Sequence, residues 1–381
     1  MARTTIRTED ITASEVTTAK MADSAFLANR NVVINGDMQI AQRGTSVQKQ
    51  YDTSNGYYTC DRVRTSQSAL DNAVWTMTQD SHLLTGPTGF PNSWKITVDT
   101  AETALATDEH IAFQMNLEAA NLQNLAYGTS AARTITISFW VKSDVAATYA
   151  MSIYASDADR NMGGTYTING ADTWEYKTIT FVGDTAGTGI NNDTGRGLTL
   201  YWYLSAGTDR TSVDNTSWAA YSTTRAAFGQ TANILATATD YWQITGVQLE
   251  IGTTATPFEH KSFGQELAAC QRYYNKTFAY ATAPANGAGH TWTGALLWDT
   301  RVTTLSPSVN WQYPVAMRAL PTVTLYNTRA SGTAGQWTTG GSDGANARAL
   351  TTSETTAAID NTGTTLGAAS WGIHATAESE L

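Results

Sequence analysis

The chain has 381 residues, a net charge of −10 at neutral pH and only 15% charged residues, with 12 Trp and 17 Tyr. The sequence has no cluster of Lys and Arg, so it lacks the basic surface that nucleic acid requires, and it has no run of about 18 apolar residues, so no membrane insertion is expected. Abundant small hydroxyl and aromatic residues instead favour an all-β protein, and the length predicts two globular domains.

The first 30 residues carry apolar side chains at every fifth position. A spacing of five scatters side chains around a helix and switches faces on a strand, so the segment cannot bury them by itself. We expect residues 1–30 to attach the protein to a larger particle and to help it trimerise; a solvated leader is the alternative. The residues expected to make these contacts are Ile6, Ile11, Val16, Met21 and Phe26.

Residues 31–260 show the alternation of half-buried strands, in which apolar side chains occupy one face and polar side chains the other. These strands predict an antiparallel sandwich. Trp202 and Trp242 share faces with aliphatic residues and are expected in its core, and Gly246 marks a bulge where the alternation shifts phase. The clearest strand patterns cover Thr134–Lys142, Trp174–Phe181, Leu198–Leu204 and Trp242–Ile251.

A short connector and a second domain follow. Helical spacing over Phe263–Tyr274 predicts a connector helix within residues 261–276. Residues 277–381 predict a second, smaller β-sandwich as the head domain, with Trp311 in its core. The Gly-rich segment Ser331–Ala345 is expected to be a mobile loop that exposes Trp337. The strands predicted in this domain cover Gly294–Trp298, Ser308–Tyr313, Pro321–Tyr326 and Ser370–Thr376.

Neither a disulfide framework nor a cofactor is expected. Cys60 and Cys270 are far apart in the sequence and fit two buried free thiols best. The five His residues are too dispersed to predict a metal cluster. The sequence leaves open one structural Ca²⁺ at turns that carry oxygen ligands, and these turns contain Asp157, Asp159, Asn191, Asn192 and Asp193.

Aromatic side chains on the polar faces of the predicted strands are the candidates for a binding site. A sugar packs its C–H face against an aromatic ring, while nearby polar groups bind its hydroxyls. The alternative is that a second layer, the connector helix or a neighbouring subunit covers these rings. The candidates are Trp140, Trp174, Tyr176, Tyr201 and Tyr203, on three strands that could be neighbours, and Trp337 on the Gly-rich loop.

Several motifs follow one another in order along residues 31–276: NVVINGDMQIAQRGTS, ITISFWVKS, TWEYKTITF, YWQITGVQLEIG and TPFEHKSFGQELAACQRYYNK. MRALPTVTLYN and HATAESEL come near the end of the chain, and ITASEVTTAKMAD near its start. Together these motifs resemble the tail-fibre and receptor-binding virion proteins of tailed bacteriophages, particularly marine and cyanobacterial phages. The resemblance implies that residues 31–260 form a jelly-roll domain akin to carbohydrate-binding modules, that the protein is a homotrimer and that it adheres to a host surface.

We therefore expect a virion tail fibre, made in the host cytoplasm, that binds a host-surface glycan without catalysis and docks on other phage proteins through its N-terminus. One alternative is a purely structural fibre or adaptor, in the tail or the head, that binds only phage proteins. The other is a glycan-cleaving tailspike. The sequence contains no GxSxG, HExxH or P-loop motif, and no repeated coil of the kind that β-solenoid depolymerases show.

Overall fold

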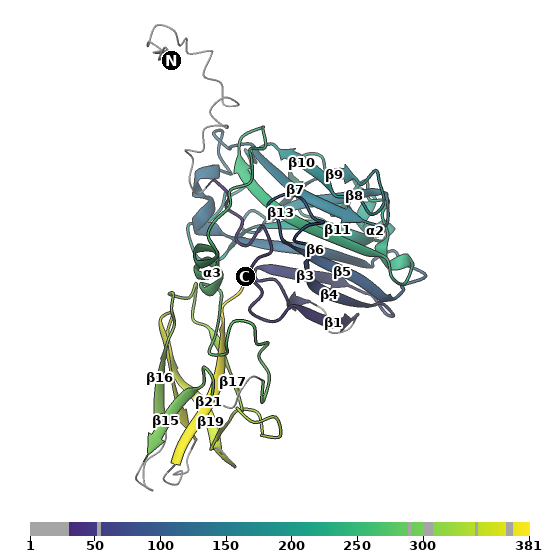
Figure 1. Cartoon of the computed structure of the whole chain (residues 1–381). Helices are drawn as coiled ribbons and strands as arrows, with labels where there is room; N and C mark the ends of the chain where they lie inside the picture. The colour runs from purple at the N-terminus through teal and green to yellow at the C-terminus, as the bar shows by residue number, and fades with distance from the viewer. Residues whose placement is uncertain (1–29, 52–54, 289–291, 301–307, 340–341, 363–368) are drawn as a thin grey trace, which may run out of the picture.

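The computed structural model describes residues 30–51, 55–288, 292–300, 308–339, 342–362 and 369–381. These residues form two β-rich parts that meet near helix α3 (Phe263–Gln271), as Figure 1 shows. The chain is therefore an all-β protein with antiparallel sheets, as predicted. The five N-terminal residues predicted to make attachment and trimer contacts, Ile6, Ile11, Val16, Met21 and Phe26, lie outside the described residues.

The first part is a sandwich of two antiparallel sheets. Its six-stranded sheet has the order β1 (Ser46–Gln50), β4 (Val74–Ser81), β5 (Asn92–Thr100), β13 (Tyr241–Ile251), β7 (Ile135–Ser143) and β10 (Glu175–Phe181). Its seven-stranded sheet has the order β12 (Ala219–Ala220), β9 (Arg160–Thr167), β8 (Thr148–Ala155), β11 (Arg196–Ala206), β6 (His110–Glu118), β3 (Val63–Ser68) and β2 (Gly56–Tyr57).

Because side chains alternate along a strand, every second side chain points between the two sheets, where a single apolar core forms. Phe139 of β7 and Trp202 of β11 meet edge to face there, with ring centroids 5.6 Å apart. Trp202 and Trp242 are fully buried, which confirms their prediction as core residues. The predicted bulge in β13 is also confirmed, because the register with β7 shifts between Thr245 and Gln248.

The second part, predicted as a smaller β-sandwich, is built from antiparallel strands connected around the long strand β21 (Ala369–Glu378). A chain of paired strands runs in the order β14 (Tyr274–Lys276), β21, β18 (Gln336–Thr338), β19 (Asp343–Thr352), β20 (Thr356–Asn361) and β16 (Ser308–Gln312). Strands β15 (Leu296–Thr300) and β17 (Thr322–Tyr326) also pair with β21. Trp311 lies in the core of this part, as predicted. The predicted loop Ser331–Ala345 is in part wrong, because it contains β18 and the start of β19.

Helix α3 begins with a capping box, in which the Ser262 side chain accepts from the Gln265 backbone and Gln265 reaches back to the backbone of Ser262. The helix ends at Gln271, earlier than predicted, because Tyr274–Lys276 pairs with β21 as a strand. The connector therefore enters the second sheet directly.

The last residues of the chain return to the sandwich and lie beside β3 and β6. The Glu380 carboxylate pairs with Arg43 and Arg62, and all three side chains are at least nine-tenths buried. The Leu381 backbone oxygen accepts hydrogen bonds from Tyr57 and Asn116. These contacts join the C-terminal segment to the first part of the molecule.

Helices are few and short. Apart from α3, the structure describes α2 (Thr208–Thr211) and three 3₁₀ segments, η2 (Ala119–Leu125), η3 (Thr223–Arg225) and η4 (Ile234–Ala236). Within the described ranges, none of the helices has the length and apolar character needed to cross a bilayer. Cys60 and Cys270 are both buried and unpaired, as predicted, and burial raises the pKa of each thiol well above its ordinary value.

Candidate functional site

An open cleft of about 430 Å³ lies on the outer face of the six-stranded sheet. Its size falls within the range of small-molecule binding pockets. The sheet supplies the base of the cleft, and two connecting segments supply the remaining walls. The cleft is lined by Thr88, Phe90, Ser138, Trp140, Tyr176, Gly246, Pro257, Phe258 and His260.

Two of the predicted aromatic residues, Trp140 and Tyr176, form one wall of the cleft. They are direct partners in the pairing of β7 with β10, and their rings lie 5.3 Å apart at 50°. Both point outward because the neighbouring side chains Phe139 and Val141 point into the core. Tyr176 is 45% exposed, so the ring pair is accessible from solvent.

The other wall comes from segments outside the strands and was not predicted. Phe90 lies in the connection between β4 and β5, and Phe258 and His260 follow β13. The Phe90 ring lies 5.0 Å from that of Phe258 and 5.1 Å from that of His260. The only sequence signal for these rings is that a proline lies beside each phenylalanine, Pro91 and Pro257, which marks a turn that can hold a ring over a sheet.

The bulge residue Gly246 lies at the base of the cleft, between the two walls. Its φ of +64° is in the left-handed region that favours glycine. A Cβ atom at this position would lie 2.9 Å from the Phe90 ring and 3.2 Å from Cδ1 of Trp140. The bulge therefore lets rings from both walls approach the backbone closely.

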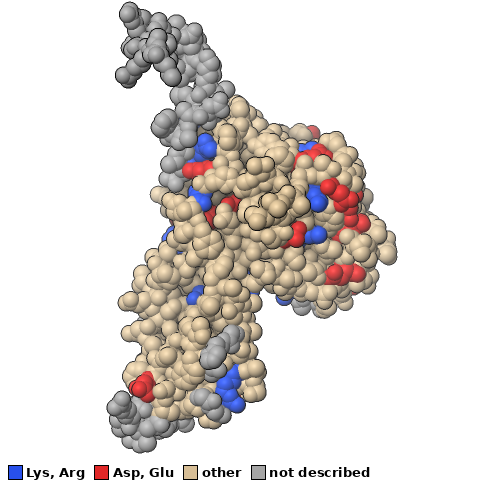
Figure 2. Space-filling view, viewed as in Figure 1, with Lys and Arg blue, Asp and Glu red and all other residues tan. Residues whose placement is uncertain are grey.

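The chemistry of the lining suits an uncharged ligand with both apolar and hydroxyl-bearing surfaces. None of its nine residues is a Lys, Arg, Asp or Glu. Ser138, Thr88 and Tyr176 supply hydroxyl groups that can donate or accept hydrogen bonds. Much of the visible surface of the molecule is also uncharged (Figure 2). Aromatic faces flanked by a few hydroxyls are the arrangement on which a sugar ring can stack.

Trp174 and Tyr201, two other candidates, lie outside the cleft. Trp174 packs beside His82, with ring centroids 5.2 Å apart. Tyr201 lies on β11 and points away from the core on the opposite sheet of the sandwich. The expectation that the three strands carrying these candidates could be neighbours is therefore wrong for β11, whereas β7 and β10 are paired. Alternation identifies the side chains that share one face of a strand, but it does not assign that strand to a sheet.

Two predicted binding residues, Tyr203 and Trp337, are buried, so neither ring is available to contact a ligand. Tyr203 is only 4% exposed, because Ala226 and Ala227 pack over it. Trp337 is fully buried in β18, and its Nε1 donates to the Asp360 backbone oxygen at 3.2 Å. The prediction that Trp337 lies on an exposed loop is wrong, because strand pairing turns this ring into the second core.

The turns predicted as calcium ligands use their oxygens in local hydrogen bonds. Asp157 accepts from the backbone and the side chain of Asn191, and Asp193 accepts from the Gly195 backbone. Asp159 accepts from the Tyr154 hydroxyl at 2.9 Å. Asp157, Asp159 and Asp193 therefore each have a hydrogen-bond partner within or beside these turns.

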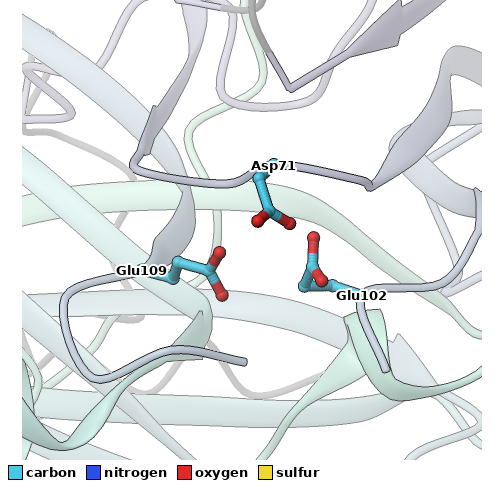
Figure 3. Close-up of side chains that lie close together, drawn as sticks. All are labelled: Asp71, Glu102 and Glu109. Carbon is cyan, nitrogen blue, oxygen red and sulfur yellow. The ribbon is translucent and has the colours of Figure 1, made fainter. Parts of the chain in front are cut away.

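Three other carboxylates come together in the described structure. Oxygen atoms of Asp71, Glu102 and Glu109 all lie within 4.8 Å of one another, and Figure 3 shows the three side chains converging from separate connections. Burial, and then the negative charges of Glu102 and Asp71, raise the pKa of Glu109. The sequence did not point to this cluster because its members are up to 38 positions apart. A Ca²⁺ ion takes six to eight oxygen ligands, more than three monodentate carboxylates supply.

Comparison with known proteins gives only distant likenesses. No family model matches the sequence, and no curated protein matches it. The structure is similar to the enzymatically active domain of bacteriophage CBA120 tailspike protein 4, with a TM-score of 0.30 and 14% identity over 58% of this chain and 22% of the tailspike chain. It is also similar to TmCBM61 in complex with β-1,4-galactotriose, with a TM-score of 0.28 and 9% identity over 59% of this chain and all of that one.

A family 11 carbohydrate-binding module from Clostridium thermocellum, in complex with a β-1,3-1,4-mixed-linked tetrasaccharide, gives a TM-score of 0.27 and 11% identity, over 56% of this chain and 99% of the module. In each case the likeness covers little more than half of the chain. The function is therefore argued from the site itself.

Proposed function

We propose that this protein is a non-catalytic glycan-binding protein that binds an uncharged sugar in the aromatic cleft. The observation that carries the proposal is the accessible ring pair of Trp140 and Tyr176, facing Phe90 and Phe258 across a cleft that no Lys, Arg, Asp or Glu lines. A sugar ring inserted there stacks its C–H face on one ring and exchanges hydrogen bonds with the hydroxyls of Ser138 and Tyr176.

The proposed setting is the tail fibre of a bacteriophage, where the protein attaches the virion to a glycan on the host surface. The order of motifs through residues 31–276, which resembles tail-fibre and receptor-binding proteins, supports this setting. A homotrimer mounted through the N-terminal segment would present three clefts, and linked sites can raise avidity by factors of roughly 100 to 10,000 over a single site.

The lining of the cleft also supports binding rather than hydrolysis. Glycoside hydrolases generally place two carboxyl groups on either side of the bond that they cleave. None of the nine lining residues carries a carboxyl group. A cleaving enzyme would need its acids at another place on the molecule.

The test is glycan-array and host-cell binding by the full-length protein and its variants. Trp140→Ala and Tyr176→Ala should each weaken binding of a neutral glycan by roughly tenfold or more, because a buried aromatic contact is lost. Tyr201→Ala removes a ring from the opposite sheet and should leave neutral-glycan binding within twofold of the wild type.

Three outcomes decide among the alternatives. Equal loss of neutral-glycan binding in Tyr201→Ala and Trp140→Ala would show that the cleft is not the binding site. No binding of any glycan or host cell by the intact wild-type protein would favour a structural fibre that binds only phage proteins. Shortening of a polysaccharide during incubation would identify a glycan-cleaving spike.

A further inference from the structure

A second polar and aromatic surface lies on the outer face of the seven-stranded sheet, opposite the cleft. The pairings Arg64 with Gln114, Gln114 with Tyr201, and Tyr201 with Ser152 place these four residues in one row across β3, β6, β11 and β8. Gln114 and Ser152 are buried, so Arg64 and Tyr201 are the accessible members of this row, and they lie two strands, or roughly 10 Å, apart. We refer to Arg64, Tyr154, Arg196, Tyr201 and Tyr221 as the Tyr/Arg surface.

The Arg64 side chain is held in place by buried amides. Its Nη1 donates to Oε1 of Gln114 at 2.7 Å, and Nε2 of Gln114 donates to Oδ1 of Asn116 at 2.8 Å. Asn116 in turn donates to the Tyr57 hydroxyl and accepts from Thr199. Gln114 occupies only one of the five N–H donors of the guanidinium group, so the network orients Arg64 while leaving donors for a ligand.

Arg196 lies on the same strand as Tyr201, at the start of β11. Its Nε donates to Oγ of Ser156 at 3.0 Å, and its guanidinium lies 5.8 Å from the centre of the Tyr154 ring. The Tyr154 ring lies 4.9 Å from that of Tyr221, which is 40% exposed. Burial raises the pKa of the Tyr201 hydroxyl, and Arg196 and Arg64 both oppose that rise, so both guanidinium groups lie within electrostatic reach of Tyr201.

These two arginines differ from six others in how their charge is compensated. In the part of the chain that the structure describes, neither Arg64 nor Arg196 forms an ion pair with a carboxylate. The arginines that do are Arg43, Arg62, Arg160, Arg272, Arg329 and Arg348. In a chain with a net charge of −10, two oriented guanidinium groups without carboxylate partners form a local site for an anion.

We propose that the Tyr/Arg surface binds an anionic oligosaccharide, whose carboxylates or phosphates accept hydrogen bonds from Arg64 and from Arg196 while a sugar ring packs on Tyr201 or Tyr221. Guanidinium groups match the planar geometry of carboxylate and phosphate oxygens, and tyrosine rings take the apolar face of a sugar. The Asp159 carboxylate, at the rim, is engaged by the Tyr154 hydroxyl. This site is independent of the cleft and differs from it in ligand class.

Calorimetric titration of the full-length protein at low salt tests this proposal with three probes. An oligogalacturonate supplies carboxylates, a mannose-6-phosphate oligosaccharide supplies phosphates, and an oligogalactose of the same length supplies neither. At least one acidic probe should bind, with an affinity that falls at least tenfold between 50 and 500 mM NaCl, roughly as screening requires. The probe that binds identifies the source of the anion.

Arg64→Gln/Arg196→Gln should weaken binding of that acidic probe at least tenfold. The matched control, Lys95→Gln/Lys142→Gln, removes the same charge from the six-stranded sheet and should stay within twofold of the wild type. Arg196→Gln alone changes an exposed side chain, so it keeps the test informative if the double variant misfolds. Trp140→Ala should not change binding of the acidic probe, which separates this site from the cleft.

The proposal is overturned by any of three results. The first is no binding of either acidic probe to the wild-type protein. The second is equal weakening in the Arg and Lys double variants, which would indicate a general effect of net charge. The third is equal affinity for the neutral oligogalactose with the same dependence on Arg64 and Arg196, which would show that the anion is not recognised.

Discussion

His110 illustrates how a single buried ring makes the stability of the sandwich depend on pH. The side chain lies at the start of β6, is only 7% exposed, and its Nδ1 has no hydrogen-bond partner in the described structure. Burial, and then the positive charge of Arg210, lower its pKa from the ordinary value of 6.5 to about 3. The folded protein therefore holds His110 neutral where the unfolded chain protonates it.

Proton linkage fixes the direction in which stability changes with pH. Between pH 6.5 and about 3 the unfolded state binds the extra proton, so the contribution of His110 to stability falls as the pH falls, by at most about 1.4 kcal/mol per pH unit. His110→Phe keeps a ring of similar size and removes the titration. Urea unfolding should show that the free energy of unfolding of this variant, relative to that of the wild type, increases steadily as the pH is lowered from 6.5 to 4.5. A constant difference would contradict the assignment.

At the scale of the element, the β13 bulge controls the shape of the cleft. Gly246→Ala should cost roughly 1–2 kcal/mol of stability, because it combines a left-handed backbone with a contact of 2.9 Å to Phe90. It should also weaken neutral-glycan binding, since Phe90 and Trp140 must move apart. Gly264→Ala, in helix α3 with open space around the Cβ, is the matched control and should lose neither stability nor binding. Unchanged binding by Gly246→Ala would remove the bulge from the site.

The elements also show what the sequence could and could not predict. Strand alternation correctly placed Trp140 and Tyr176 on an outer face and Trp202 in the core, because the period of two is a local property. The cleft also needs Phe90, which the connection between β4 and β5 places over the sheet. Such long-range contacts leave no periodic pattern. The prediction for the Gly-rich segment with Trp337 is wrong because local composition is not decisive there. The composition is typical of a loop, but pairing with β19 and β21 makes the segment around Trp337 a strand.

At the scale of the whole molecule, the C-terminal segment joins the two β-rich parts. Glu380→Gln should destabilise the protein by roughly 3–5 kcal/mol, because it removes the carboxylate partner of the buried Arg62 guanidinium and one of the two carboxylate partners of Arg43. Glu378→Gln is the matched control: its carboxylate is 46% exposed and pairs with Arg43 at 3.3 Å, so its loss should cost less than about 1 kcal/mol. Scanning calorimetry of the two variants should show a clearly larger fall in melting temperature for Glu380→Gln.

If Glu380→Gln and Glu378→Gln melt at the same temperature, the buried Glu380 carboxylate is not the contact that stabilises the C-terminal segment on the sandwich. The hydrogen bonds of the Leu381 backbone oxygen to Tyr57 and Asn116 would then be the next contacts to remove.

The sandwich carries the cleft and the Tyr/Arg surface on its two outward faces, which point in opposite directions. A domain that used both could not lie flat on a cell wall with both faces engaged. It would instead lie between two polysaccharide molecules and bind a neutral one with the cleft and an acidic one with the Tyr/Arg surface. Engagement of this kind would depend on the porosity of the polymer layer as well as on its sugars.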